Sequence, residues 1–266
     1  MIFVKILSIG NSFSEDATAY LHKISEAGNC PIDISNLYIG GCSLHMHACN
    51  IKSNEKKYRL EYNGIYTDRT VSVNEMLKTD SWDIVTVQQA SYDSGVLSSY
   101  GENGKNVVDY IRKTAPHSEI YFHETWSYEE GSDHPAFGKY GFSSSGMYSA
   151  IKSASEKFCS ENGNIPIIPC GEVINELRGK KEFDVLSGGE RLCRDGYHMS
   201  LFYGRYTLAA VWFEIFTGKD IREVCFFPDK SDIVNGFEIS DGFTPDDKKI
   251  KLIKNTVHNV CSKYLK

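Results

Sequence analysis

The sequence lacks the features that mark membrane, disulfide-rich and nucleic-acid-binding proteins. No apolar run is long enough to cross a membrane. The 29 basic residues are scattered and outnumbered by 35 acidic ones, and the net charge of −6 argues against a nucleic-acid partner. The eight cysteines stand singly, without a CxxC pair. They therefore indicate reduced, packed thiols rather than a disulfide framework or a zinc site.

Linkers, repeats and a secretory signal are missing as well. No Gly/Ser-rich, Pro-rich or highly charged segment divides the 266 residues, so we expect a single domain over 1–266. The chain runs directly into an apolar strand, without the small-residue cleavage site of a signal peptide. We therefore expect a cytoplasmic protein, although removal of a signal would leave the same pattern.

A strand followed by a sharp turn stands near the amino terminus. The apolar run 2–9 predicts a buried strand, and helical spacing follows in 17–27. Ser12 would then lie at the carboxyl edge of the sheet beside the first amides of a helix, where negative charge is favoured. Such a serine could attack an acyl group. The simpler alternative is that Asn11 or Ser12 caps the helix and Glu15 completes a capping box.

Strand-like runs alternate with helical patterns along the rest of the chain. The runs cover 2–9, 32–39, 83–87, 119–122 and 165–169, and the helical patterns cover 17–27, 73–78, 104–114, 147–161, 201–217 and the tail from 245. This alternation predicts an α/β fold with a mostly parallel five-stranded sheet covered by helices on both faces. Prolines place the last strand at an edge. The polar segment 50–72 fits either a short hairpin or an excursion over the site.

Polar or flexible residues follow several of these strands. Gly41 could bring a backbone amide close to a ligand, or could belong to an ordinary turn. The amide of Gln88 or Gln89 could donate to an oxyanion, or could simply be solvated. Asp195 could accept the Nδ1 hydrogen of His198 and leave Nε2 as a base, unless the pair only caps the next helix. Their common edge in a parallel sheet favours acyl transfer.

Two further groups suggest ligands. Aromatic side chains are frequent in the long loop 126–142, and Trp126 and Tyr128 could stack on a sugar face. His45 and His47 lie two positions apart and give a weak indication of a metal site, whereas solvent-exposed or hydrogen-bonded histidines are the simpler interpretation.

In these motifs, the chain resembles an SGNH/GDSL-type hydrolase. Gly10-Asn11-Ser12 stands where that family has Gly-Asp-Ser, Gly41 stands at its second-block glycine, and 195–198 (Asp-Gly-Tyr-His) matches its Asp-x-x-His. The first-block asparagine, and a glutamine in place of the third-block Gly-x-Asn-Asp, are similar to a bacterial branch of the superfamily. The resemblance implies a flavodoxin-like three-layer α/β/α fold and ester hydrolysis without a cofactor or metal.

The resemblance also implies a role for each matching residue. Ser12 would be the nucleophile, His198 the base and Asp195 its orienting carboxylate. The oxyanion hole would consist of the amides of Ser12 and Gly41 and one side chain, for which Gln89 is preferred over Gln88. We further expect Asn11, Trp126 and Tyr128 to contact the substrate.

The expected function is therefore a serine esterase that removes a short acyl group, most simply acetyl, from a small-molecule or oligosaccharide ester. Two other classes stay open. The first is a non-catalytic carbohydrate-binding protein on the same fold. The second is a metal-dependent hydrolase that uses His45, His47, Asp195 and His198.

Overall fold

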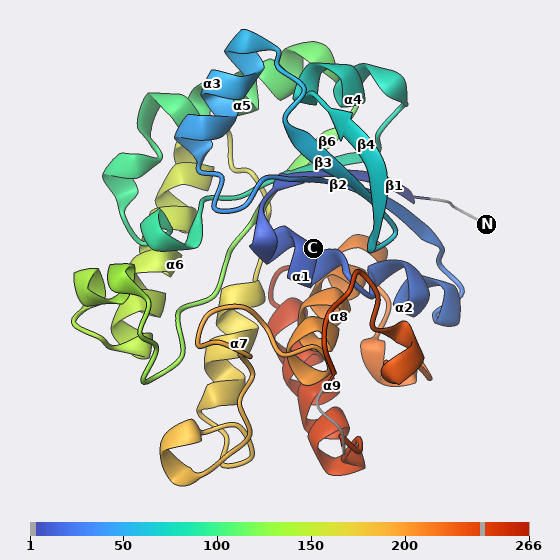
Figure 1. Ribbon diagram of the computed structural model, residues 1–266, viewed down its shortest axis with the longest axis vertical. Helices are drawn as coiled ribbons and strands as arrows, with labels where there is room; N and C mark the ends of the chain where they lie inside the picture. Colours follow the sequence, from blue (N-terminus) through green and yellow to red (C-terminus); the bar gives the residue numbers. More distant parts are fainter. Residues whose placement is uncertain (1–3, 240–242, 266) are drawn as a thin grey trace.

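The computed structural model describes residues 4–239 and 243–265, and seven strands of these residues form one central sheet (Figure 1). Their order is β4-β3-β2-β1-β5-β6-β7. Their bounds are β1 Val4–Gly10, β2 Ile32–Tyr38, β3 Tyr58–Tyr62, β4 Ile65–Val71, β5 Ile84–Val87, β6 Glu119–His123 and β7 Ile167–Ile168. The five strands expected from the sequence are parallel to one another, and β7 lies at the edge.

The other two strands correct the expected strand number. β3 and β4 form an antiparallel hairpin that pairs with β2 and extends the sheet. The two turn residues, Asn63 and Gly64, have φ of 51° and 79°. A two-residue hairpin turn needs positive φ at these positions to match the twist of the strands. The sequence left two interpretations of segment 50–72 open, a short hairpin or an excursion over the site, and the structure shows a hairpin in this segment.

The central strands are buried on both faces because their side chains alternate between two hydrophobic clusters. In β1, Ile6 belongs to one cluster and Leu7 and Ile9 belong to the other. In β5, Ile84 and Val85 divide in the same way. A continuous apolar run therefore forms a strand that needs helices on both sides.

Helices cover both faces and complete the expected three layers (Figure 1). On the face of the larger cluster lie α1 Ser12–Thr18, α2 Leu21–Ala27, α7 Cys170–Arg178, α8 Tyr203–Thr217 and α9 Asp247–Cys261. On the opposite face lie α3 Leu44–Ser53, α4 Val73–Thr79 and α5 Gly101–Thr114. Helix α6, Ser144–Glu161, contributes side chains to both clusters. No helix in the described part of the chain is long and apolar enough to cross a membrane.

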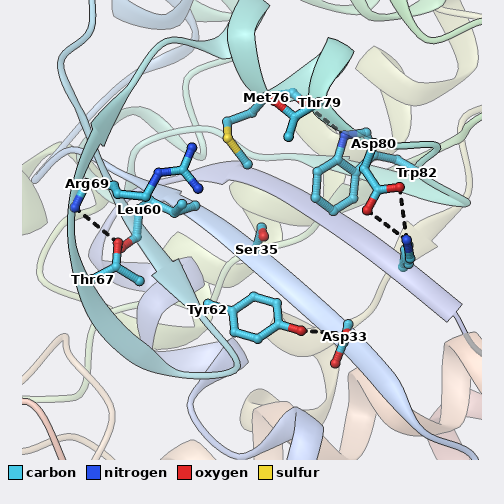
Figure 2. Close-up of a pocket in the computed structure, with 11 residues that line it drawn as sticks. Asp33, Ser35, Leu60, Tyr62, Thr67, Arg69, Met76, Thr79, Asp80 and Trp82 are labelled. Atoms are coloured by element: carbon cyan, nitrogen blue, oxygen red, sulfur yellow. Dashed lines mark hydrogen bonds and ion pairs between the residues drawn. The ribbon is translucent and has the colours of Figure 1, made fainter.

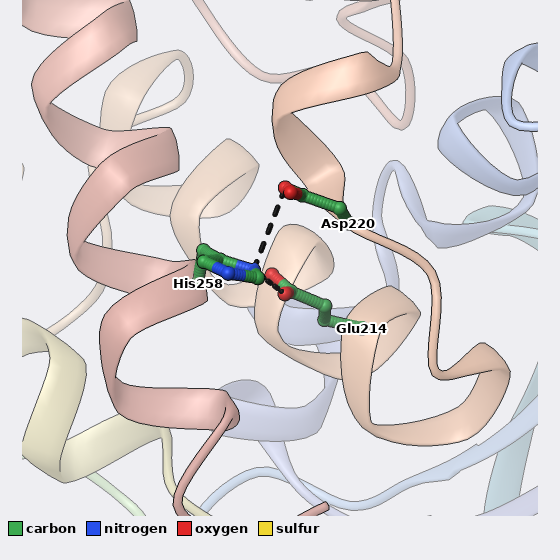
Figure 3. Close-up of side chains that lie close together, drawn as sticks. All are labelled: Glu214, Asp220 and His258. Atoms are coloured by element: carbon green, nitrogen blue, oxygen red, sulfur yellow. Dashed lines mark hydrogen bonds and ion pairs between the residues drawn. The ribbon is translucent and has the colours of Figure 1, made fainter.

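Helix α8 lies in the interior and is almost wholly buried. It ends where Gly218 adopts a φ of 66°, which matches the end expected from the sequence. Near this end, Oε1 of Glu214 lies 2.6 Å from Nδ1 of His258 on α9, and Asp220 lies 3.5 Å from the same nitrogen (Figure 3). This contact joins the last turn of α8 to α9.

The helical pattern in 17–27 forms two short helices instead of one. The break falls at Ala19 and Tyr20, between α1 and α2. The hairpin turn packs closely here, since a Cβ on Gly64 would lie 2.4 Å from the carbonyl oxygen of Ala19. The hydroxyl of Tyr20 donates to the carbonyl of Leu201, 2.6 Å away, and so connects the break to the loop before α8.

Candidate active site

Three side chains from distant parts of the sequence form one line of hydrogen bonds. Ser12 is the first residue of α1, and His198 lies in the loop that precedes α8. The Oγ of Ser12 is 2.9 Å from Nε2 of His198, and Nδ1 of His198 is 2.7 Å from Oδ2 of Asp195. The order serine, imidazole and carboxylate is the arrangement that activates a hydroxyl as a nucleophile.

The Asp195 carboxylate is held in its ionised form. Its Oδ1 accepts the backbone N–H groups of Tyr197, at 3.1 Å, and of His198, at 2.7 Å. Partial burial by itself would raise the pKa of Asp195, but hydrogen bonds from the His198 ring and these amides outweigh it and bring the pKa to about 2. An ionised carboxylate accepts a hydrogen from Nδ1, which leaves Nε2 of His198 to accept the hydrogen of the Ser12 hydroxyl.

The loop that carries His198 is fixed on its outer side by the segment after β6. The carbonyl of Gly196 accepts the backbone N–H of Glu129 at 2.8 Å, and the carbonyl of Tyr197 accepts Nε1 of Trp126 at 2.7 Å. Gly196 has a φ of 87°, and a Cβ there would lie 2.9 Å from Oγ of Ser132. The position therefore requires glycine.

Asp16 fixes the same loop on its inner side. This side chain has no exposed surface, and its carboxylate accepts Nη1 of Arg194 at 2.9 Å, Nε of Arg205 at 2.8 Å and the backbone N–H of Met199 at 2.8 Å. Arg194 also donates to the carbonyl of Met199. Because Asp16 is on α1, the helix that starts at Ser12 and the loop that holds the imidazole form one rigid unit.

The backbone N–H groups of Ser12 and Gly41 could donate hydrogen bonds to an oxyanion. Gly41 follows β2 with a φ of 62°, and in residues 4–239 and 243–265 its amide donates to no protein acceptor. Ser12 is the first helical residue, so its amide has no intrahelical acceptor. The helix cap is Asn11, and Ser14 completes the capping box that was expected of Glu15. Capping and a nucleophilic role therefore belong to neighbouring residues and do not compete.

The comparison with known proteins assigns the chain to a family. The family model described as "Domain of unknown function (DUF4886)" matches residues 5–237. The chain belongs to the DUF4886 family. A crystal structure of a DUF4886 family protein from Bacteroides uniformis has 33% sequence identity and a TM-score of 0.85, and the match covers 97% of this chain and 95% of that one. No curated protein matches the chain.

More distant solved structures share the fold of this DUF4886 chain. A protein from Slackia heliotrinireducens, described as a candidate SGNH hydrolase, has 18% identity and a TM-score of 0.56, with 80% of this chain and 98% of that chain covered. An acetyl-xylooligosaccharide esterase from Geobacillus has 14% identity and a TM-score of 0.53, with 79% and 93% covered. At these identities the likeness shows only that this chain has the α/β/α fold of these two proteins.

Gln89 does not have the position expected of an oxyanion donor in this DUF4886 protein. Its Oε1 accepts the backbone N–H groups of Leu44 and Ala90, both at 2.9 Å. Its Nε2 donates to the carbonyl and the hydroxyl of Ser99, at 3.2 and 3.0 Å. Both ends of this buried amide hold neighbouring loops, which leaves no group directed at Ser12.

Asn11 is likewise a buried structural side chain and not a substrate contact. It is 1% exposed, and its Oδ1 accepts the backbone N–H of Phe13 at 2.9 Å and Nε2 of Gln88 at 2.7 Å. Its Nδ2 donates to the carbonyl of Cys42 at 3.0 Å. Its partners are therefore the elements that surround the site.

The two aromatic residues expected to stack on a sugar are also buried. Trp126 has no exposed surface and stacks on Phe13, with ring centroids 4.1 Å apart. Tyr128 has none either, and its hydroxyl is 3.0 Å from Oγ of Ser91. These rings support the loop beneath the site, because stacking on a substrate needs an exposed face.

The histidines that suggested a metal site, His45 and His47, do not gather with Asp195 and His198 into a metal-capable group in the part of the chain that the structure describes. His47 is buried, and its Nδ1 lies 2.8 Å from the hydroxyl of Tyr58, while burial lowers its pKa to about 3. His45 is exposed on the same helix, α3. Among the described residues, metal-capable groups gather only at Glu214 and its two neighbours in Figure 3. That cluster lies at the far end of α8 from the loop that carries Asp195 and His198.

One pocket of about 440 Å³ lies at the end of the sheet where the parallel strands β1 and β2 begin (Figure 2). Lys5 and Asp33 line it at the amino-terminal ends of β1 and β2, together with Tyr62 and Trp82. Ser12 follows the carboxyl-terminal end of β1. The pocket is therefore separate from the candidate active site.

The sequence interpretation missed the residues that hold the site together. Asp16, Glu129 and Arg205 are buried. Asp16 accepts the backbone N–H of Met199, Glu129 accepts that of Leu192, and Arg205 donates to Asp16. The one available signal was charge at apolar positions, since Asp16 follows Ser12 by four residues and Arg205 lies inside an apolar helix. Buried charges need partners, but the pattern does not say which partners.

Proposed function

We propose that this DUF4886 protein is a serine esterase that removes a short acyl group, acetyl by preference, from a carbohydrate hydroxyl. The observation that carries the proposal is the unbroken line of hydrogen bonds from Ser12 through His198 to Asp195. A serine hydroxyl alone is a weak nucleophile, and this alignment supplies the base and the group that orients it. The aligned geometry supports catalysis over a binding role with a misaligned triad.

The reaction proceeds in two halves. Oγ of Ser12 attacks the acyl carbon while Nε2 of His198 takes the hydroxyl proton, and the negative carbonyl oxygen is stabilised by the amides of Ser12 and Gly41. The imidazolium then gives its proton to the leaving alcohol, and the acyl group stays on Ser12. Water, activated by His198, attacks this ester, and the acid leaves with Ser12 restored. Asp195 stabilises the imidazolium in both halves.

The carbohydrate part of the proposal has two supports. The Geobacillus acetyl-xylooligosaccharide esterase shares the fold. Two partly exposed tyrosines also lie next to the site: the Tyr92 hydroxyl donates to the carbonyl of Gly41 at 3.1 Å, and the Tyr197 ring lies 4.4 Å from the ring of His198. These rings replace Trp126 and Tyr128 as candidates for contact with a sugar, because aromatic faces suit the apolar faces of sugars.

The test is initial-rate hydrolysis of p-nitrophenyl acetate, butyrate and octanoate. We expect rates that fall with chain length, and a loss of ~10³-fold or more in Ser12→Ala and His198→Ala. Ser262→Ala, at the exposed residue that follows the last turn of α9, is the matched control and should keep the wild-type rate. A positive result leads to a screen of acetylated xylooligosaccharides.

Other outcomes would reject the proposal in favour of the alternatives. Hydrolysis that survives Ser12→Ala but is lost with a chelator would indicate a metal-dependent enzyme. Binding of xylooligosaccharides without hydrolysis of any ester would indicate a carbohydrate-binding protein.

A further inference from the structure

A chain of buried hydrogen bonds crosses the carboxyl ends of β6, β5 and β1 and reaches the turn after β2. Nδ1 of His123 lies 2.9 Å from Oε1 of Gln88, and Nε2 of Gln88 lies 2.7 Å from Oδ1 of Asn11. Nδ2 of Asn11 lies 3.0 Å from the carbonyl of Cys42. All three side chains are 1% exposed.

The carbonyl of Cys42 fixes the direction of every bond in this chain. A carbonyl only accepts, so Asn11 must present its amide nitrogen to Cys42 and its oxygen to Gln88. Gln88 then presents its own oxygen to His123, whose Nδ1 must carry the hydrogen. Burial lowers the pKa of His123 to about 3, so the ring is neutral and has a single N–H to place. Each group has one orientation that satisfies its neighbours.

The end of the chain lies at the turn that carries the Gly41 amide. The Cys42 amide donates to the carbonyl of Ile39 at 3.2 Å, which closes the turn, and the Cys42 carbonyl is held by Asn11. Asn11 immediately precedes Ser12 and also caps its helix. One side chain therefore fixes both backbone segments that bear the amides of Ser12 and Gly41.

We propose that Asn11 and Gln88 are positioning residues of the oxyanion hole, which set the separation of the Ser12 and Gly41 amides through the Cys42 carbonyl. The inference rests on the proposed esterase function and adds the residues that shape its transition-state site. His123 serves the chain by holding the Gln88 amide in one orientation.

This role explains why asparagine stands where the resemblance has aspartate. An aspartate at position 11 keeps the shape and can still cap the helix, but it has no hydrogen to donate to the Cys42 carbonyl. Its carboxylate would face that carbonyl oxygen across 3.0 Å, and the two would repel. Asn11→Asp is therefore a nearly isosteric change that removes one specific bond.

The test compares Asn11→Asp with Asn162→Asp. Asn162 is also buried and donates from Nδ2 to a carbonyl, that of Phe158, at 2.8 Å, at the end of α6. We expect Asn11→Asp to lower kcat for p-nitrophenyl acetate by ~10²-fold with KM changed less than ~3-fold. The reason is that displaced Ser12 and Gly41 amides would stabilise the oxyanion of the transition state less, while substrate binding would change little. Asn162→Asp should keep kcat within ~3-fold. Both are assayed below their Tm.

A second substitution tests the same hydrogen bonds in case the Asn11→Asp variant does not fold. Gln88→Met has a similar shape and lacks both hydrogen bonds, so it should lower kcat by about the same factor as Asn11→Asp. The double variant should be no slower than either single variant, since residues that act as one unit are not additive. The rate at which diethyl p-nitrophenyl phosphate modifies Ser12 should fall in parallel with kcat.

The outcomes separate this inference from the proposed function. Variants with a lower Tm but wild-type kcat and wild-type phosphorylation rate would show that the chain is only structural, and the esterase proposal would stand. A wild-type protein that neither hydrolyses the ester nor is modified at Ser12, or a Ser12→Ala variant as active as wild type, would overturn both proposals.

Discussion

The Asp16 carboxylate accepts a hydrogen bond of 2.9 Å from the guanidinium of Arg194, although 178 positions separate the two residues in the chain. Asp16 lies one helical turn beyond Ser12, and Arg194 immediately precedes Asp195. The contact therefore fixes the helix that begins at Ser12 against the loop that carries His198. The Asp16 carboxylate in this pair is fully buried. It also forms an ion pair with the buried guanidinium of Arg205.

Asp16→Asn should strongly destabilise the protein. The change leaves the buried Arg205 guanidinium without its counter-charge, and removal of one partner of a buried pair costs about 3–5 kcal/mol of unfolding free energy. Urea denaturation measures this. Asp109→Asn breaks an exposed pair with Lys105 on α5 and should cost less than ~1 kcal/mol. Equal costs for the two variants would show that the Asp16 cluster contributes no more than a surface pair.

Asp195→Asn should lower kcat by ~10²–10⁴-fold, because an amide nitrogen facing Nδ1 favours the wrong tautomer of His198. The pKa of Asp195 is about 2, so the carboxylate is ionised throughout the neutral range and adds no inflection to the wild-type rate profile there. Since folding lowers this pKa from 3.8, its contribution to stability is present above about pH 3.8 and is lost as the pH falls towards 2. The measurement is kcat against pH. Asp133→Asn, an exposed residue before His134, is the charge-matched control.

Much of the fold follows from the sequence because its signals are local. The apolar runs of β1 and β5 and the turn residues after them need no knowledge of the partner strands. The hairpin of β3 and β4 was left open because its strands are polar and partly exposed, with a burial pattern in β4 that does not alternate. The break between α1 and α2 lies where Gly64 packs closely on Ala19, and this contact between residues 45 positions apart in the chain gives no local signal.

For the candidate site too, the sequence indicated the residues that stand in short local motifs, but not the surroundings of the other side chains. Ser12, Asp195 and His198 could be proposed from the sequence because they stand in recognisable short motifs, and the structure brings the three side chains together. Gln89 and Trp126 were misassigned because residue type does not reveal whether a side chain faces the substrate or the core. Their buried partners are carbonyls and amides of distant loops, which no sequence pattern specifies.

Glu124→Gln should remove a pH-dependent loss of stability. Glu124 is buried at the end of β6, and burial raises its pKa from 4.5 to about 8, so the folded state binds a proton that the unfolded state releases. Stability of the wild type therefore falls as the pH rises from about 4.5 to about 8, by an amount on the order of a few kcal/mol. The glutamine keeps the Oε1 that accepts the Glu172 amide at 3.1 Å.

The measurement for Glu124→Gln is Tm across this pH range. The variant should lose the decline that the wild type shows, and Glu176→Gln, the same change on the exposed side of α7, should retain it. A variant whose Tm declines in parallel with the wild type would show that Glu124 is ionised in the folded state at neutral pH.

Trp126→Phe tests whether this ring supports the loop or contacts the substrate. The Trp126 indole is buried and donates from Nε1 to the carbonyl of Tyr197 at 2.7 Å, so phenylalanine keeps the packing but leaves that carbonyl without its donor next to His198. We expect kcat to fall about 10-fold with KM for p-nitrophenyl acetate and for acetylated xylooligosaccharides unchanged, which is the effect of losing about 1.4 kcal/mol of transition-state alignment. Trp82→Phe breaks the equivalent indole bond, to the carbonyl of Met76 at 2.7 Å, at the other edge of the sheet and should leave kcat unchanged. A rise in KM for the oligosaccharide alone would instead place Trp126 in contact with the sugar, and would mean that the loop opens when substrate binds.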